Sequence, residues 1–285
     1  MVVIGKVTDA KTFRSFLKEL NVHEKIFVVK PNWSNAHTYT SAETLDWLFS
    51  ALKGNIKVIE GYSAWRNELN IGPQPTETIT PTNAKAKWPW IREQDKWFLQ
   101  HTGIAQVLAD HGVAYINVTE ECWSTRTMDP DEVREFVDSK YGVLVNREMY
   151  RYVPTKIHQL RDSALISMNL SPDDQEHLSL ATSNLFGLIP DPARFRKWQS
   201  KSERHLSQTI IDINKIYRSF FSPCYWINQI PKQSLLVGSR NSVEADAVTA
   251  TLLGYDPGEI GYLRHAATVF GGYDEKVLTK IPQSF

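Results

Sequence analysis

The chain of 285 residues carries 32 Lys and Arg residues and 32 Asp and Glu residues, so its formal net charge is zero. A balanced charge gives no overall attraction to nucleic-acid backbones or to anionic membranes, and we expect neither partner. No stretch approaches the ~20 consecutive apolar residues that cross a bilayer. The first residues also lack the basic start and long apolar segment of a secretion signal. These features predict a cytoplasmic protein that works on a small molecule.

The two cysteines, Cys122 and Cys224, exclude sites that need several thiolates. An iron–sulfur cluster held by cysteine alone needs four, so we expect no such cluster, and a cysteine-rich structural zinc site is also excluded. We expect two free thiols, because disulfides are rare in the cytosol. The cofactor, if there is one, stays unknown.

In the first part of the chain, helical and strand patterns alternate. Apolar residues at helical spacing predict a helix over residues 13–20, and the apolar run at 26–29 predicts a buried strand that Pro31 ends. A second helix is predicted after an N-cap at Thr40 or Ser41, and it stops at Gly54. A second strand covers residues 56–59. This order favours an α/β fold with a mostly parallel sheet and helices on both faces.

Residues 71–90 interrupt this pattern. Prolines recur through the segment, and Trp88 and Trp90 flank the last of them, Pro89. We predict a long loop inserted at 71–90, which would be either a lid over a site or variable surface.

Regular patterns then resume and continue to the end of the chain. They predict helices over 92–111, 203–219 and 242–253, and strands over 113–118, 164–170 and 234–239. We expect one compact α/β unit over residues 1–285. A division into two lobes near 145–155 is left open.

Polar residues follow several predicted strands. In open α/β sheets, ligands bind beyond the carboxyl ends of the strands, so we expect these residues to share a site. Cations and hydrogen-bond donors together suit an anionic ligand, although each residue alone is also ordinary surface polarity. The residues are Lys30 and Asn32, Glu60 and Ser63, Asn169 and Ser171, and Ser239 and Arg240.

Known catalytic motifs are absent from the sequence. It contains no Gly-x-Ser-x-Gly elbow, no phosphate-binding Gly-x-x-x-x-Gly-Lys-Ser/Thr loop and no Gly-x-Gly-x-x-Gly fingerprint. Its histidines form no His-x-x-x-His pair, and a mixed metal site of Glu60, His177 and Asp246 has no spacing to support it. The basic stretch that begins at Arg194 favours a solvated helix face over a phosphate or nucleic-acid site.

Five segments together resemble a known family. They read VVKPNW at 28–33, TSAE at 40–43, IEGYS at 59–63, NLFGLIP at 184–190, and GSR, VEADAV and LGYDP between 238 and 257. In this order and spacing they resemble the domain-of-unknown-function family 362 over about residues 26–264. The resemblance implies a soluble α/β protein and brings no reaction with it.

The chain departs from that family where lysines are usual. Similar proteins carry a Pro-Lys-Leu-Lys-Thr-His run after the strand at 164–170, whereas this chain reads NLSPDD at 169–174. Ser183 stands where a lysine commonly precedes the NLFG motif, and Asn228 stands where an acid often ends a strand. Serine and asparagine cannot replace the charge or basicity of lysine. The residues that are retained are Lys30, Asn32, Glu60, Asn184, Arg240 and Asp246.

We therefore predict a metabolic or biosynthetic enzyme that uses general acid–base chemistry on an anionic substrate. Glu60 would be the acid or base, with Lys30 and Asp246 as further catalytic residues. Two alternatives stay open, a ligand-binding or accessory protein that has lost catalysis, and a metal-dependent enzyme. A homo-oligomer is also left open. The substrate would be bound by Asn32, Ser63, Asn184, Ser239 and Arg240.

Overall fold

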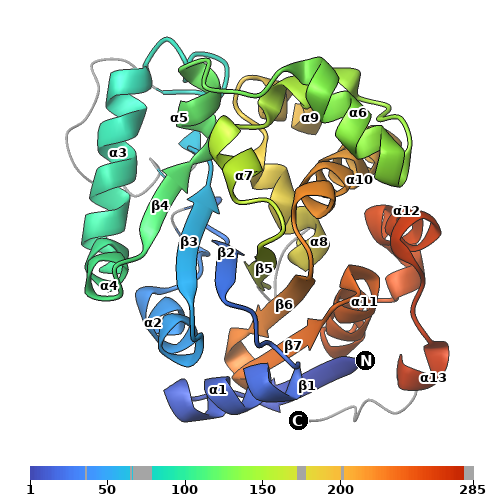
Figure 1. Ribbon diagram of the computed structural model, residues 1–285. Coiled ribbons are helices and arrows are strands. Elements are labelled where there is room, and N and C mark those ends of the chain that lie inside the picture. Colours follow the sequence, from blue (N-terminus) through green and yellow to red (C-terminus); the bar gives the residue numbers. More distant parts are fainter. Residues whose placement is uncertain (36, 65, 67–78, 172–177, 200–201, 279–285) are drawn as a thin grey trace.

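The computed structural model describes residues 1–35, 37–64, 66, 79–171, 178–199 and 202–278. Within these residues the chain builds one seven-stranded sheet in the order β1-β7-β6-β5-β2-β3-β4. Helices surround this sheet (Figure 1). The strands are β1 (Val2–Lys6), β2 (Ile26–Lys30), β3 (Asn55–Glu60), β4 (Ala114–Asn117), β5 (Ala164–Leu170), β6 (Cys224–Ile230) and β7 (Leu235–Ser239).

Most of the sheet is parallel, which confirms the α/β fold expected from the sequence. Strands β6, β5, β2, β3 and β4 run in one direction. Strand β7 pairs antiparallel with β6, and β1 pairs antiparallel with β7. The short connection η4 (Pro231–Gln233) between β6 and β7 explains the reversal, because a parallel crossover needs a much longer connection.

The order of the strands changes direction between β2 and β5. From β2 the chain adds β3 and β4 on one side, and from β5 it adds β6 and β7 on the other. Such a switch point opens a crevice between the loops that leave the two neighbouring strands in opposite directions. The strands before residue 145 and those after residue 155 therefore meet in one sheet, with Lys30 paired to Ser167.

Helices cover both faces of the sheet. One face carries α1 (Ala10–Glu19), α2 (Ala42–Ala51), α3 (Trp88–His101) and α4 (Ile104–Asp110), whose apolar side chains join one core cluster. The second cluster packs α6 (Pro130–Tyr141), α7 (Thr155–Gln159), α8 (Ala181–Asn184), α10 (Glu203–Phe220) and α11 (Ser242–Leu252) on the other face. The remaining helices are α5 (Val118–Trp123), α9 (Ala193–Gln199), α12 (Gly261–Phe270) and α13 (Glu275–Leu278), with the 3-10 turns η2 (Arg147–Tyr152), η3 (Leu185–Leu188) and η5 (Pro257–Glu259).

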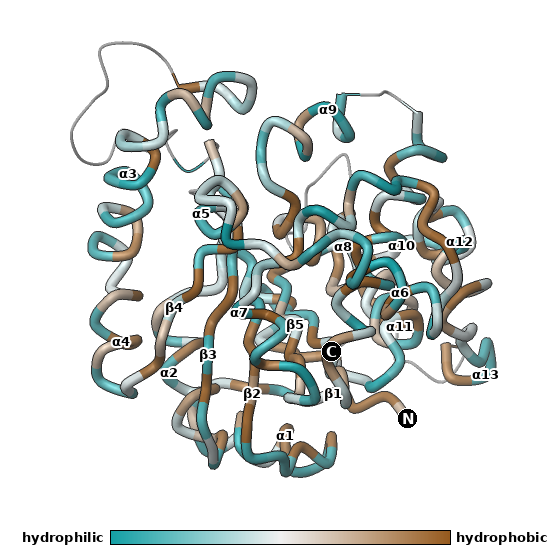
Figure 2. Tube along the Cα trace, turned by 45° about the horizontal axis from the view of Figure 1, so that its top comes forward, coloured by the Kyte–Doolittle hydropathy of each residue, from teal (hydrophilic) through white to brown (hydrophobic). Residues whose placement is uncertain are grey.

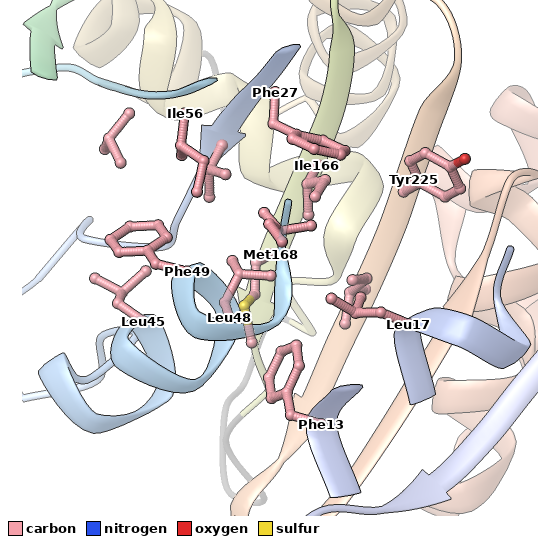
Figure 3. Close-up of a cluster of buried hydrophobic side chains, with 14 of the residues drawn as sticks. Phe13, Leu17, Phe27, Leu45, Leu48, Phe49, Ile56, Ile166, Met168 and Tyr225 are labelled. Atoms are coloured by element: carbon pink, nitrogen blue, oxygen red, sulfur yellow. The ribbon is translucent and has the colours of Figure 1, made fainter. Parts of the chain in front are cut away.

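Alternation along the central strands explains why both faces are covered. Phe27 and Val29 belong to the first cluster and Val28, between them, to the second, because successive strand side chains point to opposite faces. Brown stretches along β2 and β3 in Figure 2 mark this apolar character. Figure 3 shows the first cluster, where Phe13 of α1 and Leu48 of α2 face the strands of the sheet.

The structure corrects part of the expected insertion at 71–90. Helix α3 already begins at Trp88, with Pro89 in its first turn, where a missing backbone N–H costs nothing. Trp88 and Trp90 pack against a cluster that contains Tyr62 and Trp123. Residues 71–78 lie outside the described residues.

Two other expectations need changes. The single helix predicted over 92–111 is two helices, because Gly103 adopts a φ of 76° and ends the regular winding before α4. Strand β1 was not predicted, because residues 2–4 form too short an apolar run to stand out. None of the described helices is long and apolar enough to cross a membrane.

Leu48 provides a test of the packing between α2 and the sheet. Its side chain is 0% exposed, so Leu48→Ala is expected to lower the free energy of unfolding by about 2–5 kcal/mol, from lost burial and the cavity left behind. Val145→Ala, at a residue that is 68% exposed, should change it by less than about 0.5 kcal/mol. Urea denaturation of both variants makes the comparison, and equal effects would contradict the packing.

Candidate functional site

A cavity of about 1120 Å³ opens beyond the carboxyl ends of β2 and β5, at the switch point of the sheet. In Figure 1 this is the edge toward which the arrowheads of β3 and β4 point, where α5 and α9 lie. Its polar lining comes largely from the segments that follow the strands and includes Lys30, Asn32, Ser34, Ser63, Ser183 and Asn184. Its apolar lining comes mainly from η3, α9, α10 and α12 and includes Phe186, Phe195, Trp198, Leu206, Ile210 and Tyr262.

A buried ion pair lies at the floor of this cavity. The ammonium of Lys30, the last residue of β2, donates to Glu60 Oε2 at 2.9 Å, and both side chains are 2% exposed. The same nitrogen donates to Asn184 Oδ1 at 3.0 Å and to the carbonyl of Pro31 at 2.7 Å. All three protons of the ammonium therefore have protein acceptors.

The side chain of Glu60 accepts hydrogen bonds from three donors. Besides Lys30, its Oε2 accepts from the backbone N–H of Trp33 at 3.1 Å, and its Oε1 accepts from that of Gly61 at 2.8 Å. Glu60 is not among the residues that line the cavity, whereas Lys30 is. Lys30 and Glu60 were predicted to belong to one site, and the structure brings them into contact, but only Lys30 lines the cavity.

Burial lowers the pKa of Lys30. Desolvation is the main cause, because the charged form loses its hydration, and Glu60 opposes the shift as a nearby opposite charge. The positive charges of Arg66 and Arg194 add to the lowering. The environment therefore brings Lys30 closer to releasing a proton than a surface lysine is.

Two glycines allow the chain to approach the ion pair. A Cβ at Gly187 would lie 3.2 Å from Glu60 Oε1 and 3.4 Å from Lys30 Nζ. A Cβ at Gly61 would lie 2.5 Å from the carbonyl oxygen of Gly187, which is too close for any side chain. The segment at 184–190 can thus approach this closely because Gly61 lacks a side chain, whereas a Cβ at Gly187 would require its neighbours to shift by a few tenths of an ångström.

Asn184 fixes that segment to the sheet. Its Nδ2 donates to the carbonyl of Lys30 at 3.0 Å and to Ser167 Oγ at 3.2 Å, while its Oδ1 accepts from the ammonium of Lys30. One amide therefore joins α8 to β2 and β5. Asn184 therefore braces this segment and also lines the cavity.

Sequence reasoning missed two buried arginines next to the ion pair. Arg66 pairs with Asp95 and donates to the backbone carbonyls of Trp33 and Gly61. Arg194, at the start of α9, pairs with Asp191 at 2.7 Å.

Arg194 also donates to the carbonyls of Tyr62 and Gly187. The solvated helix face expected for the basic stretch is wrong at Arg194, which is 7% exposed. The acidic residue three positions earlier, Asp191, was the available signal, since such spacing permits a local ion pair.

Asp246 lies apart from the ion pair, buried between α8, β6 and α11. Its carboxylate is 0% exposed and accepts from Asn228 Nδ2 at 2.9 Å and from the backbone N–H of Thr182 at 3.1 Å. Burial raises the pKa of Asp246 to about 6, although the two hydrogen bonds act in the opposite direction. Asp246 does not line the cavity, so a direct catalytic role gains no support from its position.

A chain of amides connects Asp246 to the cavity. Asn228 Oδ1 accepts from Asn169 Nδ2 at 3.5 Å, and Asn169 Oδ1 accepts from Asn32 Nδ2 at 3.0 Å. A carboxylate only accepts, so each amide must point its nitrogen toward Asp246. The oxygen of Asn32 is then left to accept from Ser34 beside the cavity.

The structure separates Ser239 and Arg240 from the other predicted site residues. The guanidinium of Arg240 donates to Tyr225 Oη at 2.7 Å and lies 3.6 Å from Glu24, which precedes β2. This is the amino end of the parallel strands. The prediction that Ser239 and Arg240 share the site is wrong. Strand β7 runs antiparallel to β6, so its carboxyl end lies at the edge of the sheet opposite to the cavity.

The described residues offer no metal site of the predicted kind. No group of three or more His, Cys, Asp or Glu side chains gathers in this part of the chain. Glu60 and Asp246 belong to separate hydrogen-bond networks, and His177 lies outside the described residues.

Comparisons of the chain with models of known families, with curated proteins and with solved structures found no match. The resemblance to the domain-of-unknown-function family 362 therefore stays a prediction.

The buried ion pair can be tested by a double-mutant cycle. Lys30→Met and Glu60→Gln are each expected to lower the free energy of unfolding by about 3–5 kcal/mol, because each leaves one charge buried without its partner. The double variant should lose less than the sum of the two losses, since neither charge remains. Additive losses in urea denaturation would contradict a direct interaction.

Asp246 gives a pH-dependent test. Its pKa of about 6 in the folded protein lies above the ordinary value of 3.8, so the folded state holds the proton more tightly between these pH values. The stability that this group contributes therefore falls as the pH rises from about 4 to 6. The stability of the native protein relative to Asp246→Asn should fall over this range and stay constant above pH 7. A difference that does not vary with pH would contradict the shifted pKa.

Proposed function

We propose that this protein is an enzyme that binds a small molecule in the cavity at the β2/β5 switch point and transfers a proton through Lys30. The observation that carries the proposal is the buried Lys30–Glu60 ion pair at the floor of that cavity. The volume of about 1120 Å³ and the mixed polar and apolar lining suit a metabolite or a larger organic molecule. The proposal also keeps the cytoplasmic location and the metabolic or biosynthetic role expected from the sequence.

Lys30 is the proposed catalytic residue, and Glu60 acts through it. Lys30 lines the cavity, and burial brings its pKa down, which favours proton exchange with a bound molecule. Glu60 stabilises the ammonium when Lys30 holds the proton and fixes the position of the nitrogen. This arrangement revises the sequence prediction, in which Glu60 itself was the acid or base.

Asn32 and Ser63 are the proposed ligand-orienting groups. Ser63 donates its hydroxyl proton to the carbonyl of Ser34, so its oxygen can still accept a hydrogen bond from a ligand. Asn32 is fixed by the amide chain that ends at Asp246. Asp246 and Asn184 would therefore position the site.

Two contacts argue against the anionic substrate that was predicted from the sequence. Arg240 lies at the other edge of the sheet, and Glu60 already neutralises Lys30. The proposal therefore keeps a small-molecule substrate and leaves out a negative charge on it.

A ligand-binding protein without turnover is the second candidate, and one observation favours it. All three ammonium protons of Lys30 are bonded to protein acceptors, so a catalytic Lys30 must exchange one of these partners for the substrate. The metal-dependent alternative gains no support from these contacts.

Isotope exchange separates these candidates. The compound that co-purifies with the protein is identified by native mass spectrometry and is then incubated with fresh protein in D2O. The native protein should catalyse incorporation of deuterium, and Lys30→Gln should slow it at least ~100-fold, because the transferring amine is gone. Nuclear magnetic resonance of the compound measures the rate.

Arg240→Ala serves as the matched control, because it removes a cation at the opposite edge of the sheet, and its exchange rate should equal that of the native protein. A bound compound that shows neither exchange nor conversion would favour the ligand-binding candidate. An unchanged rate in Lys30→Gln would rule out the role of Lys30.

A further inference from the structure

We infer that the ligand of the switch-point cavity carries a protonated amine on an apolar body, and that Asp191 binds this amine. The inference rests on the proposed function, since it assigns a ligand class to the same cavity. Three observations support the inference: the charges of the residues that line the cavity, one buried carboxylate oxygen of Asp191, and the apolar lining.

The charges around the cavity favour a cation. Each lining cation already has a carboxylate partner, since Lys30 bonds to Glu60 and Arg194 to Asp191. An anion would therefore compete with a carboxylate for either of them. Carboxylates outnumber these cations in the described lining, which contains Asp191, Glu203, Asp256 and Glu259 but only Lys30 and Arg194 among lysines and arginines. Such an excess of negative charge attracts a cationic ligand.

One oxygen of Asp191 has no donor within the described part of the chain. Its Oδ2 accepts from Arg194 Nη2 at 2.7 Å, whereas its Oδ1 is buried and accepts no hydrogen bond. Asp191 is 4% exposed, so bulk water does not solvate this atom freely. A buried acceptor without a donor is costly, and an N–H of a bound amine would supply the missing bond.

The place of Asp191 links it to the floor of the cavity. Its partner Arg194 donates to the carbonyl of Gly187, and Gly187 lies directly over Lys30 and Glu60. An amine at Asp191 would therefore lie in the same cavity as Lys30, the proposed proton-transferring residue. The body of the ligand would extend along Phe186 and along Leu206 and Ile210 of α10, which offer an apolar surface.

Two probes of similar shape and opposite charge test the inference. Tryptamine carries an ammonium on an indole, and indole-3-propionate carries a carboxylate on the same ring system. We expect tryptamine to bind at least ~10-fold more tightly, because only its head group can donate to Asp191. Isothermal titration calorimetry gives both affinities, and the indole N–H resonance of Trp198 reports binding in the cavity.

Asp191→Asn should reduce the affinity for tryptamine at least ~10-fold and leave indole-3-propionate unaffected or bound more tightly. Asparagine keeps one oxygen that can accept from Arg194, so the local fold should be retained. Asp131→Asn, at an exposed carboxylate on α6, is the matched control and should change neither affinity. Should Asp191→Asn fail to fold, the exposed pair Asp256→Asn and Glu259→Gln provides a second variant, expected to reduce the preference for tryptamine several-fold.

Two results would overturn the inference in different ways. Indole-3-propionate binding as tightly as tryptamine, with a shifted Trp198 resonance, rejects the amine and leaves the small-molecule site intact. Failure of both probes to bind rejects the amine as well and also weakens the proposed function. Equal tryptamine affinity in the native protein and Asp191→Asn removes the role of Asp191.

Discussion

The structure of the site depends on the neutralisation of two charges that the fold removes from water. Lys30 and Glu60 end neighbouring parallel strands, and neither could remain charged at this depth without the other. Their pairing requires β2 and β3 to be in register, and the segment at 184–190 covers the pair by passing close to Gly61. Strand register, the glycine contact and the position of α8 therefore all meet at one buried ion pair.

Around this pair the polar groups form two connected systems. One system joins Lys30 and Glu60 to Asn184 and, through backbone carbonyls, to two buried arginines. The other runs from Asp246 through asparagine side chains to Asn32. Both end at the same cavity. The site therefore combines a charged floor with amides whose orientation is fixed by the buried carboxylate of Asp246. Networks of this kind hold a few groups in one geometry, which a specific ligand requires.

Much of this site could be predicted from the sequence because apolar runs mark buried parallel strands. The runs before Lys30 and Glu60 located their carboxyl ends, so the presence of Asn32 and Ser63 at one edge followed. Strand direction could not be predicted, because a period of two is the same in either direction, and Arg240 was therefore misplaced. Arg194 was missed because its burial depends on hydrogen bonds to the carbonyls of Tyr62 and Gly187, and backbone contacts of this kind leave no pattern in the sequence.

The floor of the cavity is assembled from segments that are far apart in the sequence, near residues 30, 60, 184 and 194. Contacts between such distant segments form only after long stretches of chain have been ordered, which makes them late and slow in folding. An incompletely folded chain would therefore have no binding site at all. Any ligand would bind the complete native state alone, so its binding energy would stabilise the whole protein by mass action rather than one part of it.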